Sequence, residues 1–208
     1  MDLIISDDFA EVQEYLAQST APTIVDIETT ALTTTKGQLL CLVLAPYDRN
    51  DVMVWWPRTP AEVAKLRIRR MVAHNGPFEL RWLSGKYGAK CPLYWDTMFM
   101  AHLIDENHPI GLDDLGHRLL GIRKEEIDVT VFGEWFGQHW EDRERVRKAN
   151  PKLWAQRKKQ VSIYVAKDGH ITRELMKWQR QHIRKNLKPG ENPVRVMRDI
   201  MIPAIEPL

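Results

Sequence analysis

The run Thr23-Ile24-Val25-Asp26-Ile27-Glu28 is apolar or β-branched up to the point where it reaches two carboxylates. Two similar runs follow at residues 39–44 and 52–56, and Thr/Gly and Asp/Arg/Asn turn residues separate the three. Three such runs in succession predict a three-stranded antiparallel meander. We expect this meander to be the first half of an α/β core.

Strand and helix patterns alternate on both sides of the meander. The predicted elements are an edge strand at 3–6, helices at 8–17, 59–68, 77–87 and 97–104, and strands at 71–73 and 93–95. Residues 111–186 are mostly helical in pattern, with an apolar stripe (Leu112, Leu115, Leu119, Leu120) and a long helix at 159–183. This order predicts an α/β fold, a mixed sheet flanked by helices.

The length of 208 residues suits one large domain with a tail. We expect the domain to cover residues 1–186 and a connector to cover 187–208, where Pro189, Gly190, Pro193, Pro203 and Pro207 interrupt any long helix. The composition, 44% apolar and 28% charged, is that of a soluble globular protein. The sequence contains neither an apolar run long enough for a bilayer nor a signal-peptide pattern, so we expect a cytoplasmic protein without a membrane partner.

The charge and cysteine patterns add two expectations. Cys41 and Cys91 lack nearby metal-ligand partners and are predicted to be buried free thiols. The net charge of +2 conceals a basic stretch, whose cations are Arg143, Arg145, Arg147, Lys148, Lys152, Arg157, Lys158 and Lys159. Such a stretch is either a solvated helix surface or a grip on a phosphate backbone. The tryptophans that flank it, at 135, 140 and 154, are open to the same two interpretations.

Asp26 and Glu28 end the first strand of the meander and lie two residues apart. Side chains at that spacing point to the same face of a strand, so the two carboxylates converge. Hard oxygen ligands of this kind suit Mg²⁺ or Mn²⁺. Taken alone, a D-x-E triplet is more often a pair of solvated turn acids, but the apolar residues before it favour a buried strand with a metal site at its end.

Two further acidic positions have both a functional and a structural explanation. Glu79 follows His74-Asn75-Gly76-Pro77-Phe78 at the predicted start of a helix, where Asn75 would act as a cap and Glu79 would favour the helix dipole. Tyr164 and Asp168 are four residues apart and share one face of a helix, as many surface pairs do.

Taken in order, D-x-E, N-x-x-F-E and Y-x-x-x-D resemble the motifs of the DEDD exonucleases, in the subgroup with a tyrosine in the last motif. The chain is similar to the 3′→5′ exonuclease, or proofreading, domain of family A DNA polymerases, from about residue 3 to residue 183. Residues 96–98 and 101–115 also look like this family, especially its phage members. Residues 198–205 resemble the segment that leads into a polymerase domain.

The resemblance implies a ribonuclease H-like fold and two divalent metal ions, Mg²⁺ or Mn²⁺. It assigns the metal ligands to Asp26, Glu28, Glu79 and Asp168, and it makes Tyr164 the residue that orients the attacking water. The other residues that it implicates are Thr29, Leu32, Asn75 and Phe78 as substrate contacts, and His74 and Asp96 as supports of the metal ligands. Glu79 departs from the family pattern, which has aspartate there, and this puts rate and metal preference in question.

The implied activity is hydrolysis of phosphodiester bonds at DNA 3′ ends with release of nucleoside monophosphates, as a proofreading step of replication. The implied partners are a single-stranded or frayed DNA 3′ end and a polymerase domain in cis or in trans, in the host cytoplasm if a phage encodes the protein. Two alternatives stay open. One is a stand-alone exonuclease similar to RNase D, and the other is a module that binds single-stranded ends with weak or no catalysis because of Glu79.

Overall fold

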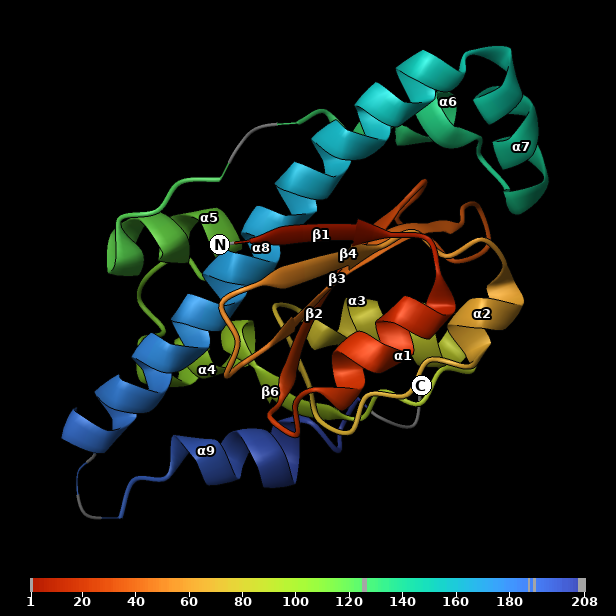
Figure 1. Cartoon of the computed structure of the whole chain (residues 1–208). Coiled ribbons are helices and arrows are strands. Elements are labelled where there is room, and N and C mark those ends of the chain that lie inside the picture. The colour runs from red at the N-terminus through yellow and green to blue at the C-terminus, as the bar shows by residue number, and fades with distance from the viewer. Residues whose placement is uncertain (1, 125–126, 187, 189, 206–208) are drawn as a thin grey trace.

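The computed structural model describes residues 2–124, 127–186, 188 and 190–205. It confirms the predicted α/β class, with one six-stranded mixed sheet flanked by helices (Figure 1). The strands are β1 Leu3–Ser6, β2 Thr23–Thr29, β3 Leu39–Pro46, β4 Val52–Trp55, β5 Met71–Ala73 and β6 Leu93–Asp96. Their order in the sheet is β1-β4-β3-β2-β5-β6.

The predicted meander is present as β2, β3 and β4, which pair antiparallel in sequence order. β1 joins the edge of the sheet parallel to β4, and β5 and β6 continue it parallel to β2. The carboxyl ends of β2, β5 and β6 therefore face the same edge of the sheet. Residues that follow these three strands are brought near one another.

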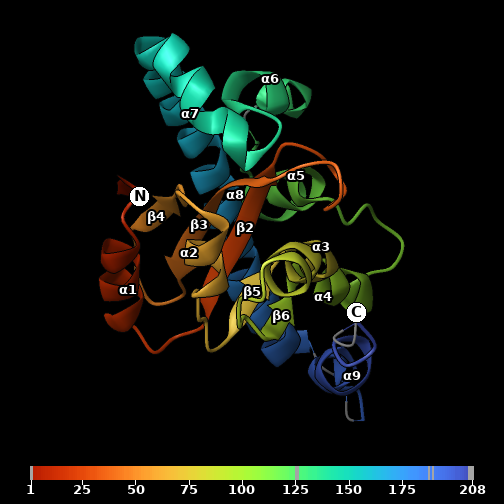
Figure 2. The same cartoon turned by 90° about the vertical axis from the view of Figure 1, so that its right-hand side faces the viewer.

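The helices lie on both sides of the sheet. The α-helices are α1 Phe9–Ala17, α2 Pro60–Ala64, α3 Gly76–Leu80, α4 Thr97–Ile104, α5 Leu112–Leu115, α6 Phe132–Phe136, α7 Trp140–Ala149, α8 Pro151–Asn186 and α9 Pro193–Val196. Shorter π-helical segments continue α3 at Arg81–Lys86, α5 at Gly116–Leu120 and α9 at Met197–Met201, and a 3-10 turn covers Val129–Val131. In Figure 2, α1 is on one side of the sheet and α3 and α4 are on the other. The first turns of α8, together with α6 and α7, extend beyond the sheet at the top of both views.

Two predicted helices have different lengths in the structure. The helix expected at 59–68 stops at Ala64, because the chain beyond it is extended: the Ile68 N–H donates to Lys90 O and the Lys90 N–H to Leu66 O. The helix expected to begin at 159 begins at Pro151, where Asn150 Oδ1 accepts a hydrogen bond from the Leu153 N–H and caps the helix. The additional turns at 151–158 have polar residues on most sides, so they lack the apolar periodicity from which a helix is predicted.

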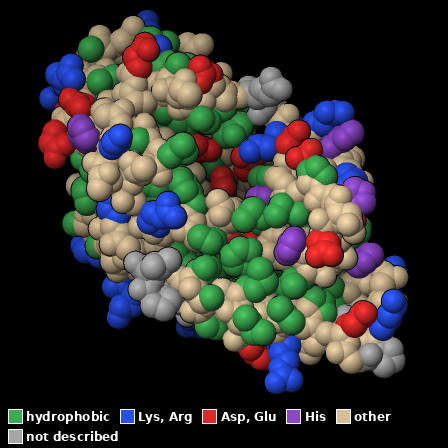
Figure 3. All heavy atoms as spheres, turned by 180° about the vertical axis from the view of Figure 1, so that it is seen from behind, with side chains coloured by type: hydrophobic (Ala, Val, Ile, Leu, Met, Phe, Trp, Pro, Cys, Tyr) green, Lys and Arg blue, Asp and Glu red, His purple; other side chains and the backbone are tan. Residues whose placement is uncertain are grey.

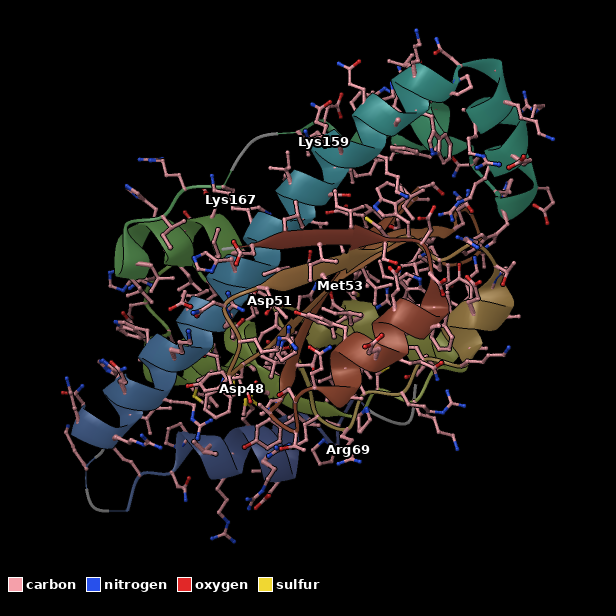
Figure 4. The ribbon with its side chains drawn as sticks, in the orientation of Figure 1. Asp48, Asp51, Met53, Arg69, Lys159 and Lys167 are labelled. Carbon is pink, nitrogen blue, oxygen red and sulfur yellow. The ribbon has the colours of Figure 1, made fainter. Side chains whose placement is uncertain are left out.

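Helix α8 is fixed across the sheet by buried polar contacts. Trp56 Nε1 donates to Ser162 Oγ at 2.9 Å. Lower on the helix, the buried Arg173 donates to the carbonyl oxygens of Arg49 at 2.6 Å and Asp51 at 3.2 Å, in the turn between β3 and β4. Asp51 is labelled beside α8 in Figure 4. These contacts hold α8 at two levels and thereby limit how far it can slide along the sheet.

The remaining expectations concern the cysteines, the tail and the membrane. Cys41 and Cys91 are buried and free, as predicted. In the expected connector, Leu187, Pro189 and residues 206–208 lie outside the described residues, whereas α9 and Met197–Met201 contact α4, and the latter also β6. Within the described part of the chain, the helices are all too short or too polar to traverse a lipid bilayer.

Candidate active site

β2 carries two carboxylates toward the helix α8. Asp26 lies opposite Val43, and Glu28 lies opposite Cys41, in the pairing of β2 with β3. Side chains of directly opposed residues, and of residues two apart, share one face of a sheet. The register shifts between Glu28 and Thr29, so the regular strand is interrupted immediately after the second carboxylate.

α8 supplies the third carboxylate, Asp168, which is 3% exposed. The helix approaches the sheet closely at the next residue, since a Cβ on Gly169 would lie 2.7 Å from Cγ1 and 2.8 Å from Cγ2 of Val43. Only a residue without a side chain fits there. Tyr164 lies one turn earlier on the same face of the helix.

Asp26, Glu28 and Asp168 form a group whose ligand oxygens all lie within 4.8 Å of one another. Burial, followed by the nearby charge of Asp168, raises the pKa of Asp26 to about 8. Burial and then the charge of Asp26 raise the pKa of Glu28 well above its usual range. Carboxylates crowded in this way repel one another, and Oδ1 of Asp168 is buried without a hydrogen-bond partner.

This arrangement fits a hard divalent cation. The group offers oxygen donors alone, which Mg²⁺ and Mn²⁺ prefer, and a cation would relieve both the repulsion and the unpartnered oxygen. Figure 3 shows a hollow on the face opposite to that of Figure 1, with acidic side chains on its floor and hydrophobic side chains around its rim. The chemistry of the donors thus selects the ion that the sequence indicates.

Glu79 belongs to α3, directly after β5, and lies outside the group of three. It is 2% exposed, and its Oε2 is buried without a hydrogen-bond partner. Burial raises the pKa of Glu79 well above its usual range, and the charge of Asp26 adds to this effect. A fourth carboxylate is therefore buried close enough to Asp26 for the two charges to interact.

Asp96 holds two helix starts together. Its Oδ1 accepts hydrogen bonds from the backbone N–H groups of Met98 and Phe99 and caps α4, while its Oδ2 accepts from the Gly76 N–H at 2.6 Å. The expectation that Asn75 caps α3 through its side chain is wrong: Asn75 makes no such bond, because it adopts the left-handed conformation with φ 75° and is exposed. Asp96 takes over part of that function from the neighbouring strand.

His74 is hydrogen-bonded to the start of α4, the helix that Asp96 caps. Its Nδ1 lies 2.9 Å from Oγ1 of Thr97, whose hydroxyl donates to the carbonyl oxygen of Ala73. Burial, and then the positive charge of Lys124, lowers the pKa of His74 to about 4. The imidazole is therefore neutral near pH 7 and makes a structural hydrogen bond.

The expected substrate contacts lie in two places. Leu32 is 79% exposed in the segment after β2, and this segment is anchored because Oγ1 of Thr30 donates to Gln138 O at 2.9 Å. Thr29 is half-buried and donates to the carbonyl oxygen of Ala31. Phe78 is half-buried on α3, the helix of Glu79.

Lys124 contacts the carboxylate group, and the sequence reasoning missed it. Its Nζ lies 2.6 Å from Oδ2 of Asp168 and 5.1 Å from the centre of the Tyr164 ring. Lys124 lies about forty residues from both in sequence and belongs to no recognised motif. No local pattern could have found it.

The basic stretch is partly internal. Arg143 donates to the carbonyl oxygens of Pro57, Leu39 and Leu40, and its guanidinium lies 4.0 Å from the centre of the Trp140 ring. The flanking tryptophans at 135, 140 and 154 are partly buried and pack against the main core. Arg143 and these rings therefore fix α6 and α7 to the sheet. Most of the other cations of the stretch face solvent: Arg145, Arg147, Lys148, Lys152 and Lys159.

Comparison with known proteins identifies the family of this chain and solved structures with a similar fold. The profile of a 3′-5′ exonuclease family named for DNA polymerase A matches residues 4–184. RNase D of Trypanosoma brucei superposes with a TM-score of 0.62 at 15% identity, covering 99% of this chain and 73% of that one. RNase D of Escherichia coli superposes with a TM-score of 0.56 at 18% identity, covering 99% of this chain and 50% of that one. The POL domain of Pol1 from M. smegmatis superposes with a TM-score of 0.63 at 13% identity, covering 98% of this chain and 30% of that one. No curated protein matches the sequence.

Proposed function

This chain belongs to the 3′-5′ exonuclease family, and we propose that it hydrolyses the terminal phosphodiester bond at DNA 3′ ends with divalent metal ions and releases nucleoside monophosphates. One observation carries the proposal. Asp26, Glu28 and Asp168, from β2 and α8, converge within 4.8 Å, and Oδ1 of Asp168 and Oε2 of Glu79 are buried without partners. Without a cation these carboxyl groups either repel one another or stay protonated, as the raised pKa of Asp26 indicates, whereas a bound cation would allow all of them to be ionised.

The four carboxylates divide into two sets. Asp26, Glu28 and Asp168 would hold one ion, and Glu79, which interacts electrostatically with Asp26, would help to hold a second. Two bound ions would supply charge stabilisation for the attacking and leaving oxygens and would lower the pKa of a bound water. Because Glu79 lies outside the group of three, its ion is expected to bind more weakly.

Tyr164 would orient the attacking water. Burial, and then the charges of Asp168 and Glu28, raise the pKa of Tyr164 to about 12. The phenol therefore stays protonated near pH 7, which suits a hydrogen-bonding group that aims a water molecule and does not suit a general base.

The substrate end would be held by apolar contacts beside the carboxylates. Leu32 exposes 79% of its surface, so its side chain is free to pack against a base. Aromatic side chains that stack on unpaired bases, as Phe78 would, contribute roughly 1–3 kcal/mol per base and do so without dependence on sequence. Because a mismatched end unpairs at a lower cost than a matched end, such a site favours proofreading. A polymerase domain, in cis or in trans, is the partner that we propose.

Digestion of 5′-labelled single-stranded DNA and of RNA with the same sequence, each with Mg²⁺ or Mn²⁺, tests the activity. We expect a 3′→5′ ladder on DNA that disappears in Asp26→Ala, and faster removal of a mismatched than of a matched 3′ terminus. A ladder on RNA alone would instead favour an enzyme similar to RNase D. If neither substrate is shortened, the enzymatic proposal fails and an end-binding module takes its place.

A further inference from the structure

Lys124 presents a cation at the opening of the carboxylate group. Its Nζ bonds Oδ2 of Asp168 at 2.6 Å, whereas Oδ1 of the same carboxylate has no partner. The side chain of Lys124 is 23% exposed and that of Asp168 is 5% exposed, so the ammonium lies nearer to the solvent than the carboxylate that it contacts. The ammonium thus occupies one oxygen of Asp168, leaves the other free for a metal ion, and stays accessible from outside.

The fold holds Lys124 in this place. Its backbone N–H donates to Oδ1 of Asp113 at 2.9 Å. The segment that carries Asp113 packs on α8 through a cluster that includes Leu115 and Ile171, and a Cβ on Gly116 would lie 3.0 Å from Cγ2 of Ile171. The ammonium therefore reaches Asp168 from an anchored backbone that is packed against the same helix.

The charges of the proposed metal site do not balance the negative charge of the substrate, and Lys124 can supply the missing positive charge. Four carboxylates and two divalent ions sum to zero, so they provide no net positive charge for a phosphodiester and an attacking hydroxide. A lysine ammonium that bonds a carboxylate stays protonated near pH 7, so Lys124 supplies a positive charge at this point. Its position over the Tyr164 ring puts it on the side of the site that we assign to the attacking water.

We propose that Lys124 is a substrate-binding residue of this site, whose ammonium contacts a non-bridging oxygen of the terminal phosphodiester. The inference rests on the proposed function and adds a phosphate contact from outside the three motifs. Without nucleic acid the ammonium rests on Asp168, and with nucleic acid it is shared between Asp168 and the phosphate. Hydrogen bonds between charged groups of this kind are among the stronger polar contacts in proteins.

Binding can be measured apart from hydrolysis. The full chain is titrated into a 5′-fluorescein oligothymidylate, and anisotropy is followed with Ca²⁺ in place of Mg²⁺, since the larger ion binds carboxylates with looser geometry. A gel verifies that the oligonucleotide stays intact. A second oligonucleotide has a methylphosphonate at its last linkage, which removes the charge of the phosphate that Lys124 is proposed to contact.

We expect Lys124→Met to weaken binding of the natural oligonucleotide by about tenfold or more, and Lys124→Arg to weaken it much less. Lys124→Met and the unaltered protein should bind the methylphosphonate oligonucleotide equally. Lys90→Met, at an exposed lysine without a contact to the carboxylate group, is the matched control and should bind as the unaltered protein does. Lys124→Gln replaces Lys124→Met if circular dichroism shows that the methionine variant does not fold.

Two results would overturn the inference: equal binding of the natural oligonucleotide by Lys124→Met and the unaltered protein, or a deficit of the same size on the methylphosphonate. Failure of the proposed function has a different signature, because the unaltered protein would then shorten neither DNA nor RNA, whether or not it binds them. If the unaltered protein is active and Lys124→Met binds the natural oligonucleotide as well as the unaltered protein does, the proposed function stands and only the proposed contact between Lys124 and the phosphate is wrong.

Discussion

Gly169 on α8 lies against Val43 on β3 so closely that a methyl group at position 169 would come within 2.7 Å of Cγ1 of Val43. Val43 is the cross-strand partner of Asp26, and Gly169 follows Asp168 in sequence. The contact between the glycine and the valine therefore sets the separation between the carboxylates of Asp26 and Asp168. A positioning role for Gly169 follows from this geometry.

We predict that Gly169→Ala pushes α8 away from β3, because the added methyl group would lie within 2.8 Å of both Cγ atoms of the buried Val43. Overpacking of this kind costs about 1–3 kcal/mol, measurable by urea unfolding. Nuclease activity should fall by more than the loss of folded protein explains, since Asp168 moves with the helix.

Gly85→Ala is the matched control, since a Cβ there meets only the Leu80 carbonyl oxygen, at 3.8 Å. It should leave both stability and activity close to those of the unaltered protein. Full activity in Gly169→Ala would show that the helix tolerates the added methyl group and that the contact does not position Asp168.

Divalent ions should stabilise the protein through the group of three carboxylates. At a concentration a hundredfold above the dissociation constant, binding to the native state alone adds about 2.7 kcal/mol, so Mg²⁺ or Mn²⁺ should raise the Tm in a thermal scan. Asp26→Asn should lose most of this rise. In the absence of metal and above about pH 8, where the carboxyl group of Asp26 is ionised, it should be more stable than the unaltered protein by roughly 0.5–2 kcal/mol, because one of the crowded charges is gone. An equal rise in Asp26→Asn would place the ion elsewhere.

Glu79→Gln separates the two proposed ions. Glu79 lies outside the group of three, so this variant should retain the tighter Mn²⁺ site and lose the weaker one, which titration followed by electron paramagnetic resonance can count. Its nuclease rate should fall by a factor on the order of 10² or more, since one ion can no longer stabilise the leaving oxygen. Glu79→Asp, which restores the residue of the family pattern, is the companion variant and should bind both ions. Two intact sites in Glu79→Gln would contradict the assignment.

Arg143 is predicted to act in folding and not in binding nucleic acid. Arg143→Lys cannot reproduce the fork of bonds to Pro57, Leu39 and Leu40, so it should destabilise the protein by about 1–3 kcal/mol. Arg145→Lys, at a side chain that is 76% exposed, should change little and serves as the control. The salt dependence of DNA binding should be the same in both variants. A weaker salt dependence of DNA binding in Arg143→Lys, but not in Arg145→Lys, would indicate that Arg143 contacts the nucleic acid.

His74 should make the protein less stable in mild acid. Its pKa is about 4 in the folded chain against an ordinary value of 6.5, so the unfolded chain binds a proton first as the pH falls. The contribution to stability is complete above about pH 6.5 and declines toward pH 4, by on the order of 2–3 kcal/mol. His74→Asn keeps a donor toward Thr97 without this titration, so its advantage over the unaltered protein should grow on acidification. His102→Gln, at an exposed histidine, should show no such gain. A constant difference between pH 7 and pH 4 would contradict the shift.

The sequence by itself determined the parts of this protein that lie within single elements. The period of two in β2 directs Asp26 and Glu28 to one face, and the spacing of four aligns Tyr164 with Asp168 on a helix, whatever surrounds them. The β2–β3–β4 meander follows from three apolar runs with turn residues between them, and short connections leave few other ways to pair. The fold class and three of the carboxylates were therefore accessible from local pattern.

Only the tertiary structure decided how these elements meet. It separated Glu79 from the group of three, made Asp96 the residue that binds Gly76, turned Arg143 inward, and brought Lys124 to Asp168. Each of these outcomes depends on a distance between residues far apart in sequence, set by contacts such as that between Gly169 and Val43. Local periodicity records which face a side chain occupies, but the packing of one element on another determines which charges share that face.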